Sequence, residues 1–150
     1  MDKKWQERHK KIKEKIFGTT EWLYKYTSLQ EELKNKQKET ITYHNACHFG
    51  RVFNIKKEPR ELLKQVYQIN EMKDPNMCCG FGGITIQTEK FDLAIKAGQK
   101  KANIIKQTKA DIVSAECSAC RMQITEQLDK VGDNKIFKHP LELIAKAIEG

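Results

Sequence analysis

The 150-residue chain is long enough to bury one hydrophobic core, and its 39% hydrophobic and 32% charged residues are typical of a soluble globular protein. No apolar run approaches the roughly 20 residues that a membrane-spanning helix needs, and the charged residues 1–5 do not resemble a secretory signal. The formal net charge of +8 is shared equally by residues 1–40 and 41–150, and no nucleic-acid-binding motif accompanies it. We therefore expect a soluble domain that does not bind nucleic acid.

Basic residues are concentrated at the N-terminus. Residues 3–17 are predicted to form a helix with one apolar stripe among lysines, and a second helix is predicted from Thr19 or Thr20 to about residue 33. The apolar positions are Trp5, Ile12 and Ile16 in the first helix and Leu23, Tyr26, Leu29 and Leu33 in the second. We interpret residues 1–38 as a basic helical extension with a solvated face; the alternative is a docking surface for an acidic partner or for membrane headgroups.

From residue 39 onward, β-prone runs alternate with helical patterns. Strands are predicted at 41–44, 111–115 and 136–138. Helices are predicted from Pro59, from about 88 to 107, through Met122 and Leu128, and from His139-Pro140. The expected inward positions of three of these helices are Leu62, Leu63, Val66 and Ile69; Phe91, Ala94, Ile95, Ala102 and Ile105; and Leu141, Ile144 and Ile148. The alternation predicts the α/β class, with a small, largely parallel sheet flanked by helices and a ligand site beyond the carboxyl ends of the strands.

Five cysteines form the most unusual pattern in the sequence. Residues 78–83 read Cys-Cys-Gly-Phe-Gly-Gly, Cys47 lies upstream, and Cys117 and Cys120 form a C-x-x-C pair downstream. The odd number argues against a purely disulfide role, so we expect a reducing, cytoplasmic compartment and metal-ligating thiols. The cysteines fall on the predicted carboxyl side of the sheet, and we expect the helix that follows the glycine turn to direct its N-terminal dipole at them.

The residues alone leave three interpretations of these thiols open. Buried cysteines can pack as small hydrophobic side chains, although adjacent cysteines beside a glycine turn are an awkward choice for packing. A structural zinc ion takes four ligands, which five cysteines exceed. An iron–sulfur cluster offers several irons with terminal thiolate ligands, so an adjacent pair can bind different irons.

From about residue 41 to the end, the chain resembles the CCG cysteine-rich domain family. The resemblance rests on Cys47 in its Tyr-His-x-x-Cys-His-x-Gly-Arg context, on residues 59–63, on residues 78–83, on residues 110–113, on the segment from Cys117 to Gln123, and on residues 139–143. This family occurs in the B subunit of heterodisulfide reductase and in iron–sulfur subunits of glycolate oxidase, L-lactate utilisation and anaerobic glycerol-3-phosphate dehydrogenase complexes. Members usually also carry a ferredoxin module and often two CCG domains, so the chain is expected to be either a piece of a longer subunit or a short subunit with separate partners.

The resemblance implies a function for residues 39–150. The implied ligands of a four-iron cluster, in some members a noncubane one, are Cys47, Cys78, Cys79, Cys117 and Cys120. The implied role is electron transfer in a flavin- or quinone-linked oxidoreductase that oxidises a 2-hydroxy acid, and the sequence shows no substrate site of its own. The implied partners are a flavoprotein dehydrogenase subunit and a ferredoxin-type iron–sulfur module, with peripheral association of the complex at the inner face of the membrane. The alternative from another class is a zinc-stabilised docking module for a partner subunit.

Three histidines and one arginine accompany the predicted site. We expect His44 and His48 to form hydrogen bonds to sulfur or backbone rather than to ligate metal, because five thiolates are available. We expect His139 to cap the last helix, and Arg51 either to offset negative charge at the site or to form a surface salt bridge.

Overall fold

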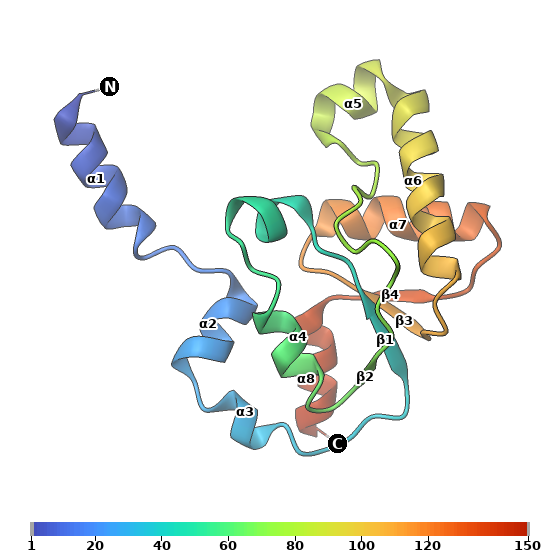
Figure 1. Ribbon diagram of the computed structural model, residues 1–150, viewed down its shortest axis with the longest axis horizontal. Helices are drawn as coiled ribbons and strands as arrows, with labels where there is room; N and C mark the ends of the chain where they lie inside the picture. Colours follow the sequence, from blue (N-terminus) through green and yellow to red (C-terminus); the bar gives the residue numbers. More distant parts are fainter. Residues whose placement is uncertain (1, 150) are drawn as a thin grey trace.

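A computed structural model describes residues 2–149 and contains a four-stranded sheet in which all strand pairs are parallel (Figure 1). The strand order is β2-β1-β3-β4, and the strands are β1 (Thr40–Tyr43), β2 (Gln68–Ile69), β3 (Ile112–Ser114) and β4 (Ile136–Lys138). The register pairs Ile41 with Ile112 and Val113 with Phe137. The predicted α/β fold with a parallel sheet is therefore confirmed.

Helices cover both faces of the sheet. The helices are α1 (Lys3–Lys13), α2 (Thr19–Tyr26), α3 (Leu29–Glu32), α4 (Glu58–Leu63), α5 (Gly83–Glu89), α6 (Phe91–Lys106), α7 (Ser118–Lys130) and α8 (Pro140–Glu149), with a π-helical turn η1 (His48–Val52). One face of the sheet packs against α4 and α8, and the other packs against α6 and α7 (Figure 1). Side chains that alternate along β3 separate the two cores, because Ile112 belongs to the first and Val113 to the second.

One predicted helix is divided in two, and another begins slightly later than expected. The helix predicted to about residue 33 breaks after Tyr26, where the Thr27 hydroxyl donates to the Leu23 carbonyl and accepts from the Leu29 N–H. The helix predicted from about 88 to 107 corresponds to α6, which begins at Phe91 after Lys90 (φ −132°) ends the additional helix α5. Tyr26 and Phe91, which we expected to be buried, are both exposed. At Thr27, local side-chain hydrogen bonds thus override an apolar periodicity that runs across the break.

Two further helices differ from the sequence-based expectation. The helix that begins near Pro59 ends at Leu63, and Ile69 lies in β2, a two-residue strand that we did not predict. In α8, Pro140, Leu143 and Ala147 are buried, each one residue before a predicted position, whereas the predicted Leu141 is half-buried and Ile148 is exposed. Only Ile144 belongs to both sets.

The N-terminal segment has two parts with different burial. Helix α1 extends away from the sheet and contains no buried residue, so its predicted apolar stripe is exposed (Figure 1). Helix α2 is attached to the domain, because the buried Thr20 hydroxyl donates a 2.7 Å hydrogen bond to the Glu116 carboxylate. The boundary at residue 38 stays a prediction.

Among the described helices, none combines the length and apolar character that crossing a bilayer requires.

Residue His139 caps helix α8, as predicted. Its side-chain Nδ1 atom accepts a 3.2 Å hydrogen bond from the backbone N–H of Leu141. Its backbone N–H donates a 2.6 Å hydrogen bond to the carboxylate of Glu142. Burial is the main cause that lowers the pKa of His139. The neutral imidazole is therefore the form that the folded state favours.

Replacing His139 with alanine is expected to reduce the free energy of unfolding by about 1 kcal/mol at pH 8. Because the folded-state pKa of His139 is lowered, its stabilisation is present above the unfolded pKa and is lost as the pH falls through the folded one. Urea denaturation at pH 8 and pH 5 should therefore show a smaller difference between His139→Ala and wild type at pH 5. The exposed His9→Ala variant serves as a control. A difference that is the same at both pH values would contradict the cap.

Candidate metal centre

All five cysteines lie on the carboxyl side of the parallel sheet. Cys47 follows β1 and precedes η1, and Cys117 follows β3 and caps α7, which carries Cys120 in its first turn. Cys78 and Cys79 lie in the loop between β2 and α5. The carboxyl ends of neighbouring parallel strands lie at one edge, so cysteines far apart in the sequence converge there.

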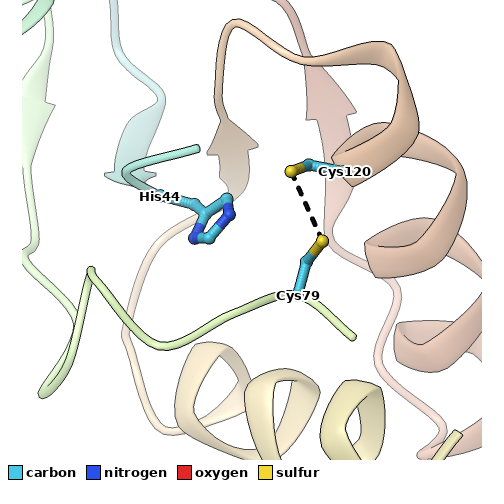
Figure 2. Close-up of side chains that lie close together, drawn as sticks. All are labelled: His44, Cys79 and Cys120. Carbon is cyan, nitrogen blue, oxygen red and sulfur yellow. Dashed lines mark hydrogen bonds between the residues drawn. The ribbon is translucent and has the colours of Figure 1, made fainter. Parts of the chain in front are cut away.

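Two of the cysteines and one histidine form the centre of the site (Figure 2). The Cys79 and Cys120 sulfur atoms are 3.3 Å apart and share a hydrogen bond. The imidazole of His44, which follows β1, lies beside them, and the potential ligand atoms of the three residues all lie within 4.8 Å of one another. All three residues are buried. The arrangement provides two soft sulfur donors and one nitrogen donor in a space shielded from water.

The other three cysteines lie closer to solvent. Cys117 is half-buried, whereas Cys47 and Cys78 are exposed. Cys117 interacts with Cys120, Cys78 interacts with Cys79, and a charge on Cys47 acts on Cys78. The structure thus links Cys78, Cys79, Cys117 and Cys120 into one group with a buried pair at its centre, and places Cys47 near enough for its charge to act on Cys78. The assignment of each cysteine as a metal ligand stays a prediction.

The thiols of this group differ in their proton affinity. Hydrogen bonds from Cys120 and Cys78 lower the pKa of Cys79, and a hydrogen bond with Cys120 lowers the pKa of Cys117 to about 6. Hydrogen bonds to Cys117 and Cys79 raise the pKa of Cys120. The thiols of Cys79 and of Cys117, which occupies the N-cap position of α7, are therefore the two that most readily become thiolates, the form in which sulfur binds metal.

Helix α7 directs its N-terminus at the thiols. The backbone N–H groups of Ala119 and Cys120, in its first turn, help to lower the pKa of Cys117. We predicted this role for a helix after the glycine turn, but that segment is divided, and α6 meets the cysteine loop with its middle, near Gly98. The dipole that acts on a cysteine is therefore that of the helix after β3.

Gly80 allows the cysteine loop to lie against α6. Its φ of +93° is in the left-handed region, and a Cβ atom there would lie 2.5 Å from both the Ala94 carbonyl oxygen and the Gly98 nitrogen. A residue with a side chain cannot occupy this position without moving the loop or the helix. The glycine thus fixes the position of the preceding Cys79.

The loop is also held from its other side. Asn45 donates from its backbone to the Pro75 carbonyl at 3.0 Å, and Arg51 donates to the Asn76 carbonyl at 3.0 Å. The Lys101 ammonium on α6 donates to the Asp74 carbonyl at 2.8 Å. Arg51, which we expected to offset charge or to form a salt bridge, therefore fastens the segment that precedes the two adjacent cysteines.

His44 lies beside the sulfur and backbone groups that we expected it to contact. Cys79 and the Pro75 backbone act on its imidazole, but among the described residues neither ring nitrogen is in good hydrogen-bond geometry, although the residue is only 1% exposed. Burial is the main cause that lowers the pKa of His44, which favours the neutral imidazole. An unpaired, neutral and buried imidazole beside two thiols fits a thiophilic metal as a ligand or close neighbour, because burying its nitrogens without a partner is costly. His48 is exposed in η1.

Sequence analysis missed Lys101, although a signal for it was available. On helix α6 the buried positions are Ala94, Gly98, Lys101, Ala102 and Ile105. Helical spacing therefore places this lysine on the buried stripe of the helix. A lysine at such a position needs a reason beyond solubility.

Comparison with known proteins gives the family. The model of the family named CCG, the cysteine-rich domain, matches residues 41–125. The D subunit of dihydromethanophenazine:CoB–CoM heterodisulfide reductase from Methanosarcina barkeri is 30% identical over 115 residues, which are 73% of this chain and 28% of that protein. A protein from Methanococcus maripaludis described as an uncharacterized iron-sulfur protein is 37% identical over 93 residues, 61% of this chain and 19% of that protein. Lactate utilization protein A from Bacillus subtilis is 27% identical over 146 residues, 95% of this chain and 60% of that protein.

The chain thus spans about a quarter of the heterodisulfide reductase subunit and three fifths of the lactate utilization protein. The family match covers more than half of this chain and includes all five cysteines, from Cys47 to Cys120. The chain belongs to the CCG cysteine-rich domain family.

Proposed function

We propose that the chain binds an iron–sulfur cluster through Cys47, Cys78, Cys79, Cys117 and Cys120 and carries electrons within an oxidoreductase complex. The observation that carries the proposal is the contact between Cys79 and Cys120, a buried sulfur pair 3.3 Å apart with further thiols on both sides. Five thiols exceed the four ligands of one zinc ion, whereas the irons of a cluster take separate terminal thiolates.

The buried and the exposed cysteines have different proposed roles at the site. Cys79 and Cys120 supply buried thiolates, and the surrounding core excludes water from them. Cys47 and Cys78 lie at the exposed side, where a partner protein can approach closely enough for electron exchange. A bound cluster supplies the one-electron chemistry.

The relatives support a place in a larger assembly. Two are described as subunits of a heterodisulfide reductase and of a fumarate reductase, and a third as a lactate utilization protein. We propose that the chain works with a flavoprotein subunit and a ferredoxin-type iron–sulfur module, in a flavin- or quinone-linked complex that oxidises a 2-hydroxy acid or reduces a disulfide. The proposed setting is the cytoplasm, with the complex at the inner face of the membrane.

One observation supports zinc as a second candidate. His44, Cys79 and Cys120 form a compact buried set to which Cys117 is linked, and one nitrogen with three sulfur donors is a common structural zinc site. On this alternative the domain is a docking module without redox chemistry.

Reversible reduction separates the two candidates. Protein reconstituted with iron and sulfide without oxygen is expected to lose visible absorbance when dithionite is added and to recover it when a mild oxidant is added. Zinc-loaded protein is expected to show neither change, because zinc has no accessible second oxidation state. An iron-loaded protein that does not respond to dithionite or to the oxidant would contradict the electron-transfer function.

A further inference from the structure

Among the residues that the structure describes, Lys101 is a buried cation with no carboxylate in contact. Its exposed fraction is 0%, and its ammonium donates hydrogen bonds to two neutral groups, the carbonyl oxygens of Asp74 at 2.8 Å and Pro75 at 3.4 Å. Within residues 2–149, none of the ion pairs includes this lysine. Two carbonyl groups do not neutralise a charge that has been removed from water, so a further negative partner is expected.

The nearby thiols are suited to be that partner. Burial lowers the pKa of Lys101 to about 8, while negative charge on Asp74, and then on Cys79, Cys120 and Cys78, acts to raise it. The Asp74 carboxylate accepts hydrogen bonds from the backbone N–H groups of Asn76 and Met77, so it is engaged within its own loop. Asp74 and the cysteines therefore both bring negative charge near the lysine without forming a contact ion pair with it.

We propose that Lys101 is the internal counter-charge of the metal centre. This inference rests on the proposed function, since it assigns the lysine a role toward the group that the cysteines bind. A fixed positive charge lowers the energy of the more negative state of that group. For an iron–sulfur cluster, the more negative state is the one that has accepted an electron, so the lysine raises the reduction potential.

The alternative is that Lys101 has only a structural role. On this alternative the lysine acts only by fastening the loop before Cys78, through its hydrogen bonds to the two carbonyl groups, and its charge has no effect on the metal centre. Lys101→Gln retains an N–H donor and removes the charge, whereas Lys101→Met removes both. The adjacent Lys100 is exposed on the same helix, so Lys100→Gln is a matched control that changes the net charge equally.

The test is a redox titration of the reconstituted full chain without oxygen, followed by low-temperature paramagnetic resonance with dithionite as the reductant. Lys101→Gln and Lys101→Met are both expected to shift the reduction equilibrium about tenfold toward the oxidised state, about 59 mV for a one-electron couple. Lys100→Gln is expected to match wild type. A wild-type potential in Lys101→Gln would overturn the inference, whether or not Lys101→Met still binds the cluster.

The outcome for the wild type separates this inference from the proposed function. If the wild type holds zinc and no sulfide, the electron-transfer proposal fails. The counter-charge role of Lys101 can then be tested by measuring the zinc affinity of the same variants. Both Lys101 variants are then expected to bind zinc about tenfold more weakly than Lys100→Gln, since a thiolate-rich zinc site is also negatively charged. Equal affinity in all of them would overturn the counter-charge.

Discussion

Replacing Cys79 with serine is expected to abolish cluster binding. Cys79 is buried, its pKa is lowered, and its sulfur atom contacts that of Cys120 at 3.3 Å, so it is one of the two buried donors at the centre of the group. Losing a partner of a metal ligand already weakens metal binding by about 10- to 100-fold, and losing a central ligand is expected to cost more. Iron and sulfide per chain, measured after anaerobic reconstitution, report the loss.

Companion variants make this result specific. Cys120→Ser is expected to behave like Cys79→Ser, whereas Cys47→Ser is expected to retain part of the iron, because Cys47 is exposed at the edge of the group. Ser118→Ala is the control, since Ser118 is exposed in the same C-x-x-C segment and is expected to leave the iron content unchanged. Wild-type iron in both Cys79→Ser and Cys120→Ser would refute the assignment of the buried pair as ligands.

Replacing Gly80 with alanine is expected to produce the second large effect. The added Cβ would lie 2.5 Å from the backbone of α6 at Ala94 and Gly98, in a conformation (φ +93°) that disfavours side chains. Backbone strain and overpacking together are expected to lower the free energy of unfolding by about 3 kcal/mol or more. Because Cys79 is displaced with the loop, iron binding is expected to fall as well.

Gly83 offers a matched control for this variant. Its φ of +79° is also left-handed, but among the described residues a Cβ atom there would meet nothing within 4 Å beyond its chain neighbours and the backbone of its own helix. Gly83→Ala is therefore expected to cost only the backbone strain, about 1 kcal/mol, in urea denaturation. Equal losses of stability in the two variants would mean that the contact between the loop and α6 is unimportant.

The location of the cysteines could be predicted from the sequence. Strand-forming residues directly precede Cys47 and Cys117, and parallel strands bring the residues after their carboxyl ends to one edge of a sheet. The helix break at Thr27 could not be predicted in the same way, because the apolar periodicity continues across it. Periodicity reports which face of a helix is buried, whereas a break depends on a few local hydrogen bonds and backbone angles.

The difference in burial among the five cysteines could be seen only in the structure. Sequence spacing treats the five cysteines as equivalent, but tertiary packing makes Cys79 and Cys120 the buried pair and leaves Cys47 and Cys78 exposed. His44 was expected to contact sulfur or backbone, and the two thiols beside it, those of Cys79 and Cys120, come from segments far away in the sequence. Contacts between segments so far apart leave no pattern in a single sequence.

The most direct test of the central claim is the amount of iron, acid-labile sulfide and zinc per chain in protein purified without oxygen. We expect about four irons and four sulfides per chain, with little zinc, and a paramagnetic resonance signal that depends on the redox state. One zinc per chain without sulfide would contradict the iron–sulfur centre and would leave the domain as a zinc-stabilised docking module.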